Sequence, residues 1–262
     1  MSAKSYKKYE KKYSKEIKSY LKKRYLGKSS DDPDTRFSFS QKIKRKKNII
    51  KKKVLFLHAF RDANNNSWNN KQVFDSYFEW VRFTLNAINE KDDFKNWYIK
   101  KHPAGKYYQN EDEILNKLLK KFNVPYSALK NCPSTSEILE NKMPIYSNQG
   151  TIILETATKG YGTYFCNLRF NKRYGFFISS KNEWKNCVNL SYKRASNNFI
   201  SKNIKQAAQY KLWQIYKKNI PEICPTRVIW KDNYFTVLKI IFSQCLNTLF
   251  IKSKNFTIPK IH

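Results

Sequence analysis

Short apolar runs alternate with longer segments of helical periodicity between residues 54 and 168. Each run is rich in β-branched or aromatic residues and ends in a polar loop, as buried parallel strands do. We expect strands at 54–58, 97–101, 144–147 and 163–168, and a weaker one at 124–129. Helices are expected at 71–89, 111–122, 134–140 and 152–159. This order predicts an α/β fold, a Rossmann-like doubly wound parallel sheet.

The segments on either side of this alternation differ in pattern. Residues 5–26 place Tyr, Ile and Leu on one face of a basic helix, and Gly27 follows as a C-cap residue. Beyond residue 190, helices are expected at 196–218 and 234–250. We therefore divide the chain into a basic helix with a polar linker (1–53), a Rossmann-like domain (54–190) and a C-terminal helical extension (191–262).

The chain of 262 residues has a formal net charge of +32, which favours an anionic partner. Nearly half of this excess lies in residues 1–53, which hold 20 Lys/Arg against 5 Asp/Glu. The aromatic residues follow helical stripes and strands rather than a basic-aromatic repeat, so we do not expect nucleic acid as the partner. An anionic substrate or an anionic membrane surface fits the charge better.

Cysteine usage and hydropathy bear on the cellular compartment. The five cysteines form no C-x-x-C pair, so neither a zinc site nor a disulfide framework is expected. The first 53 residues lack the apolar core of a signal peptide, and no run of 18 apolar residues occurs. We expect a cytoplasmic protein, with a peripheral position at the inner face of the cell membrane as an alternative.

Two of the three histidines follow expected strands. His58 and His102 each close an apolar run, and ligands of open α/β sheets bind at the carboxyl ends of such strands. Pro103 keeps His102 extended, and Gly105 permits a tight turn. We expect both imidazoles to meet a phosphate there; the alternative is a histidine satisfied by backbone contacts.

The loop after His58 contains two further candidates. Arg61 can bind a phosphate through two parallel hydrogen bonds. Asp62 can orient the imidazole of His58. The alternative for Asp62 is a turn or helix cap.

A third candidate cluster opens the helix expected at 152–159. Gly150 allows close approach to the backbone, and Thr151 can cap the helix or bind a ligand through its hydroxyl. Glu155, one turn along, can receive a ribose hydroxyl pair. Alternatively Thr151 only caps, and Glu155 is a solvated residue or a buried partner of a structural Lys or Arg.

Several motifs are absent from the chain. It contains no G-x-G-x-x-G, no Walker A sequence, no serine nucleophile elbow and no D-x-D metal signature in a suitable loop. These absences disfavour a dinucleotide oxidoreductase, a kinase and a hydrolase.

Five short motifs together resemble the capsule polysaccharide biosynthesis glycosyltransferases. They are YLKKRYLG (20–27), FLHAFRDA (56–63), FEW (78–80), KKHP (100–103) and GT (150–151) with Glu155. More loosely, the pattern is similar to GT-B transferases, including glycerophosphotransferases and Kdo or sialic-acid transferases. The resemblance spans about residues 15–190. It implies the C-terminal half of a GT-B fold, with a nucleotide-sugar-binding domain at 54–190.

The resemblance also implies a reaction and a set of site residues. The donor is a CMP-, CDP- or UDP-sugar, the acceptor is a polysaccharide or lipid-linked, and neither a metal ion nor a cofactor is needed. His58 would be a second phosphate contact or assist the leaving group, with Asp62 beside it as the other catalytic residue. The substrate-binding residues would be Arg61, His102, Pro103, Gly105, Gly150, Thr151 and Glu155.

The chain departs from the family in two places. Only the basic helix precedes the first strand motif, where the family has an acceptor-binding half, and residues 159–162 read KGYG instead of a small residue and a Gly-Pro turn. We therefore expect a donor-binding half that is a fragment, a split-gene product working with a separate N-terminal-half chain, or a degenerate remnant. The alternative function is a non-catalytic module that binds membranes or polyanions. In either case we expect His58, His102 and Thr151 together on a solvent-open sheet edge, with helix 5–26 packed beside the domain.

Overall fold

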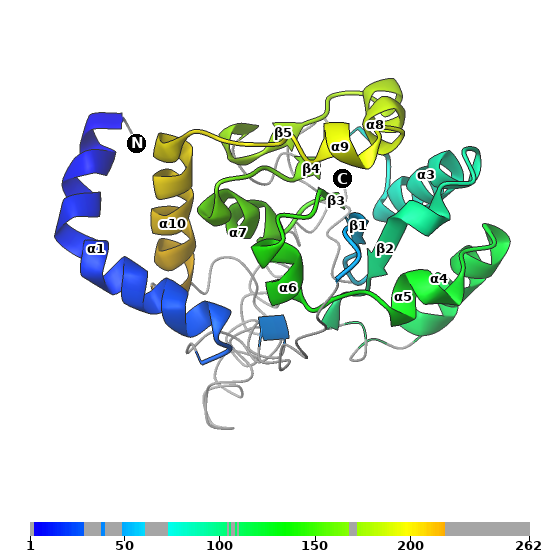
Figure 1. Ribbon diagram of the computed structural model, residues 1–262, viewed down its shortest axis with the longest axis horizontal. Helices are drawn as coiled ribbons and strands as arrows, with labels where there is room; N and C mark the ends of the chain where they lie inside the picture. Colours follow the sequence, from blue (N-terminus) through cyan, green and yellow to red (C-terminus); the bar gives the residue numbers. More distant parts are fainter. Residues whose placement is uncertain are drawn as a thin grey trace, which may run out of the picture. The chain divides into compact units, whose positions relative to one another are not determined.

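A computed structural model describes residues 3–28, 38–39, 49–60, 73–103, 105, 108, 110–167 and 172–217. Its centre is a five-stranded sheet of order β2-β1-β3-β4-β5 in which every pair of neighbours is parallel (Figure 1). The strands are β1 (Lys53–Phe56), β2 (Trp97–Lys100), β3 (Ile145–Ser147), β4 (Tyr164–Phe165) and β5 (Phe176–Phe177). The expected parallel α/β sheet is confirmed and is consistent with a Rossmann-like fold. The strand order reverses between β1 and β3, where open α/β sheets bind their ligands.

Helices connect the strands and flank the sheet. They are α1 (Ala3–Tyr25), α3 (Tyr77–Asn89), α4 (Glu111–Lys121), α5 (Tyr126–Lys130), α6 (Thr135–Glu140), α7 (Ile152–Lys159), α8 (Lys181–Val188), α9 (Tyr192–Ala195) and α10 (Lys202–Lys217). Short 3-10 helices lie at Phe94–Asn96 and Lys172–Tyr174.

Two hydrophobic cores lie on opposite faces of the sheet. Successive strand residues point to opposite faces, and so Leu55 joins the core that contains Trp80 and Trp184, whereas Val54 joins the one that contains Ile153. Helices α3, α4 and α8 contribute to the first core, and α1, α6, α7 and α10 to the second. Layers on both faces explain why the strands read as continuous apolar runs.

The predicted elements differ from the observed ones at a few places. The weak strand expected at 124–129 is wrong: Pro125, with φ −66°, precedes the short helix α5. Helix α3 begins only after Ser76, whose side chain accepts a hydrogen bond from the amide of Glu79. The capping box of Ser134 and Glu137 is confirmed at α6. The helix expected at 234–250 lies outside the described residues.

The flanking helices are part of the core of the α/β unit. Ile17 and Leu21 of α1, and Ala208 of α10, are buried in the same cluster as the apolar side of α7. Helix α1 lies beside α10 (Figure 1), where the rings of Tyr13 and Trp213 have centroids 5.1 Å apart. The described helices and strands belong to one compact unit, which extends to Tyr216. The core therefore includes residues beyond 190.

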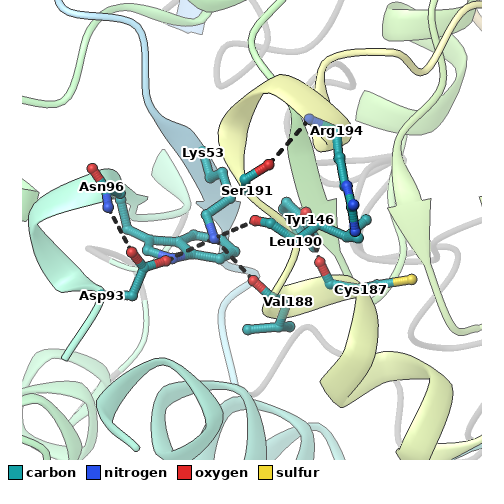
Figure 2. A network of polar contacts seen from close by, with 10 residues as sticks. Lys53, Asp93, Asn96, Tyr146, Cys187, Val188, Leu190, Ser191 and Arg194 are labelled. Carbon is teal, nitrogen blue, oxygen red and sulfur yellow. Dashed lines mark hydrogen bonds and ion pairs between the residues drawn. The ribbon is translucent and has the colours of Figure 1, made fainter. Parts of the chain in front are cut away.

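A buried lysine joins three segments at the amino edge of the sheet (Figure 2). Lys53 is 2% exposed, and its ammonium donates to Asp93 Oδ2 at 2.7 Å and to the carbonyl oxygens of Val188 and Leu190 at 2.9 Å each. It also lies 4.5 Å from the ring centroid of Trp97. All three N–H donors are therefore satisfied, and the network is structural.

This network predicts a pH-dependent loss of stability. Burial tends to raise the pKa of Asp93, but hydrogen bonds from Lys53 and Asn96 and the charge of Lys53 hold that pKa below its ordinary value of 3.8. The stabilisation is therefore complete above that ordinary value and is lost as the pH falls through the lower folded-state pKa. We expect Asp93→Asn to be less stable than the wild type near pH 7, with the difference shrinking at acid pH.

Urea unfolding at pH 7 and at pH 3 measures the difference in stability between Asp93→Asn and the wild type at each pH. Asp92→Asn, at the exposed neighbouring position, is the matched control and should unfold like the wild type at both values. A difference between Asp93→Asn and the wild type that stays constant with pH would contradict the proposed ion pair.

Candidate functional site

Three strand-end loops bring candidate residues to the carboxyl edge of the sheet. His58 lies two residues after β1, His102 two residues after β2, and Gly150 three residues after β3. The rings of His58 and His102 stack with centroids 5.4 Å apart and planes at 25°. The predicted placement of both histidines at one edge is thus confirmed. Thr151 lies there too, and all three side chains are partly exposed.

His58 is held from two sides. The hydroxyl of Tyr77 accepts a hydrogen bond from the His58 amide at 2.6 Å and donates to its carbonyl oxygen at 3.1 Å. Burial holds the pKa of Tyr77 far above its ordinary value, so the hydroxyl keeps its proton. The ring Nε2 lies 2.5 Å from the carbonyl oxygen of Gln149. Because a carbonyl only accepts, Nε2 carries a proton.

Gly150 makes room for the His58 ring. A Cβ added at Gly150 would lie 2.6 Å from Nε2 and 2.7 Å from Cε1 of His58. The residue also has φ +113°, a conformation that side-chain-bearing residues rarely adopt. The sequence assigned this glycine to close approach by a ligand. In the structure it is a histidine ring that approaches, so Gly150 positions His58.

Thr151 stands at the amino end of α7 but does not cap it. Its side chain makes no capping hydrogen bond. The amides of Ile153 and Leu154 donate to the carbonyls of Gly150 and Thr151 at 3.2 and 2.9 Å. The amides of Thr151 and Ile152 donate none among the residues the structure describes. The positive end of the helix therefore lies beside the histidine pair.

Glu155 does not have the arrangement expected of a ribose ligand. It is 4% exposed, and its carboxylate forms an ion pair with the guanidinium of Arg24 on α1. Nearby, the hydroxyl of Tyr25 forms a hydrogen bond with that of Thr158. Glu155 therefore has the structural role that was the alternative in the sequence, and it joins α7 to α1. We correct the ribose assignment accordingly.

The loop after β2 turns sharply behind His102. The amide of Gly105 donates to the His102 carbonyl at 3.1 Å, as expected for a tight turn. Pro103 lines a cavity beside β2, together with His102. Arg61 and Asp62 lie outside the described residues, so their proposed roles stay predictions.

One acidic residue at this edge was not predicted from the sequence. Glu111, the first residue of α4, is 5% exposed, and its Oε1 accepts from the amide of Phe60 at 2.6 Å. Its Oε2 is buried with no hydrogen-bond partner among the described residues. It ties the loop after β1 to the start of α4. The only sequence signal was an acidic residue at a helix start, which is common for reasons of the helix dipole.

Neither a metal-binding cluster nor a membrane-spanning helix is found in the described ranges. No three His, Cys, Asp or Glu side chains gather there in a way that could hold a metal ion. None of the helices in those ranges combines the length and the apolar character needed to cross a membrane.

Comparison with known proteins adds no relative. No family model, no curated protein and no solved structure matches the chain. The geometry of the sheet edge is therefore the basis for assigning a function.

Proposed function

We propose that this chain binds the nucleotide-sugar donor of a metal-independent glycosyltransferase and forms its GT-B-type donor half. The expected donor is a CMP-, CDP- or UDP-sugar, used to build a capsule or a related surface polysaccharide. The observation that carries the proposal is the stacked pair of His58 and His102 beside the amino end of α7. A sheet edge at the strand-order reversal is where such folds hold nucleotides.

Three kinds of group at this edge suit a phosphate. Imidazole N–H groups donate hydrogen bonds, and the protonated ring adds a charge. The amino end of α7 contributes backbone N–H groups and the positive end of the helix dipole. The Thr151 hydroxyl makes no capping bond and can donate to a phosphate oxygen.

The same groups would stabilise the leaving phosphate. Transfer of the sugar breaks its bond to the phosphate oxygen, and negative charge develops there. Preorganised donors aimed at that oxygen lower the barrier electrostatically. The Nε2–H of His58 is engaged with Gln149, so in this proposal the ring donates to the phosphate through Nδ1, in its doubly protonated form. His58 is therefore a phosphate contact in this proposal and not the base that activates the acceptor.

The acceptor needs a second site. In the family that the sequence resembles, the acceptor lies on a second Rossmann-like half across a cleft. We propose that such a half, in a separate chain or in the same polypeptide, completes the active site over the edge that carries His58 and His102.

Titration calorimetry with CMP-, CDP- and UDP-sugars tests the proposal. We expect saturable binding of one nucleotide class, and about tenfold weaker binding by His102→Ala, which corresponds to roughly 1.4 kcal/mol. Lys95→Ala removes an exposed charge just before β2, at the other edge of the sheet, and should bind like the wild type. Absence of saturable binding up to millimolar nucleotide, or equal affinity in His102→Ala, would reject it.

A further inference from the structure

A cavity of about 270 Å³ lies beside the end of β2, next to the histidine pair. Its apolar wall includes Ile99 and Leu129, and its polar wall includes Lys100, His102 and Cys132. None of the described residues that line it is acidic. The cavity shares His102 with the proposed donor site and otherwise has its own residues.

Lys100 brings a positive charge to this cavity. Its ammonium has three donors, and among the described residues it makes one hydrogen bond, to the carbonyl oxygen of Pro133 at 2.9 Å. Burial lowers the pKa of Lys100, while electrostatic interaction with Cys132 and Glu137 tends to raise it. The ammonium is thus partly desolvated, and two of its three N–H groups make no hydrogen bond to a described residue.

The nearby carboxylates are occupied elsewhere. Glu137 Oε2 accepts from the amide and the hydroxyl of Ser134 at 2.8 and 2.7 Å, in the capping box of α6. Asp112 pairs with the exposed ammonium of Lys101 at 2.8 Å. Within the described residues no carboxylate forms an ion pair with Lys100. A partly buried cation without such a partner favours an added anion.

We propose that this cavity is an anion-binding subsite for a phosphate or carboxylate group, with Lys100 as its principal cation. The inference goes beyond the proposed function because it needs no nucleotide. Because the subsite adjoins the donor site through His102, the anion would be a second charged group of the substrates. Anion binding by the cavity does not depend on the proposed function, whereas the assignment of the anion to a substrate rests on it.

Cys132 provides a reporter inside the cavity. Burial raises the pKa of its thiol to about 11, and the charge of Lys100 opposes that rise. The rate of its alkylation by uncharged iodoacetamide, resolved by peptide mass spectrometry, therefore reports access and local charge. Cys187, which is partly buried on α8 and does not line the cavity, is the matched control in the same sample.

Alkylation is measured in phosphate, in acetate and in chloride at one ionic strength. We expect phosphate, acetate or both to slow the reaction at Cys132, about threefold at an anion concentration twice the Kd. Cys187 should react at the same rate throughout. Slowing by phosphate alone assigns a phosphate group, and slowing by both assigns oxyanions generally.

Substitution of Lys100 completes the test. Lys100→Gln should abolish the protection of Cys132. If the Gln variant does not fold, Lys100→Met is tested in its place. His102→Ala, which removes a donor-site group, should weaken nucleotide binding and leave much of the protection. Equal rates at Cys132 in all three salts, equal slowing at Cys187, or protection that survives the loss of Lys100 would overturn the proposal.

Discussion

Gly150→Ala is expected to abolish donor binding and to lower the free energy of unfolding by about 3 kcal/mol, from backbone strain and overpacking together. The added methyl would collide with the His58 ring, which lies within 2.7 Å of it. The alanine at position 150 would also have to adopt a φ of +113°. Either the ring or the α7 amino end must move, and the proposed site needs both. Urea unfolding and nucleotide titration measure the two effects.

Gly105→Ala is the control for the stability effect. It stands in the loop after the neighbouring strand, and the nearest atom to its added Cβ is Glu111 Cγ at 3.4 Å, an ordinary contact. It should therefore unfold close to the wild type. Retention of both stability and nucleotide affinity by Gly150→Ala would show that the His58 ring is not held against α7.

Glu155→Gln is expected to destabilise the fold by about 3–5 kcal/mol, because it removes a carboxylate that forms an ion pair with the buried guanidinium of Arg24. Arg24 is 1% exposed and Glu155 is 4% exposed. At roughly 2–4 °C per kcal/mol for a domain of this size, the Tm should fall by about 10 °C. Nucleotide affinity below the transition should stay unchanged, because the pair lies in the core between α1 and α7.

The double variant Arg24→Met, Glu155→Leu separates a charge effect from a packing effect. Replacing both residues removes both buried charges, so much of the lost stability should return. A Glu155→Gln protein with wild-type Tm and weakened nucleotide binding would restore the ribose role that the sequence suggested.

Local sequence features predicted β1 to β4 and the histidine pair, but not β5 (Phe176–Phe177). Each strand is a short apolar run, and a strand-end residue such as His58 or His102 is placed by the direction of the strand alone. Helix α7 was predicted with its observed bounds. A glycine follows it in the sequence, and in the structure Gly160 ends the helix with φ +89°. Such signals lie within a few residues of the element they define.

Contacts between distant segments could not be predicted in the same way. Arg24 and Glu155 are 131 positions apart, and nothing near Glu155 shows which face of α7 will be covered by α1. The role of Gly150 depends on a ring that follows another strand. The burial of Lys53 depends on carbonyl groups of the α8–α9 connection, so a lysine that ended a basic run was read as part of a linker.

The proposed function requires that His58 and His102 together contact the phosphate of the donor. The same nucleotide titration can be followed through the side-chain nitrogens of the histidines by NMR. The chain has three histidines, and His102→Ala and His58→Asn identify two sets of signals by their loss. We predict that the nucleotide class bound shifts the signals of both His58 and His102 along one saturating curve. Saturable binding with either set of signals unchanged would contradict the claim.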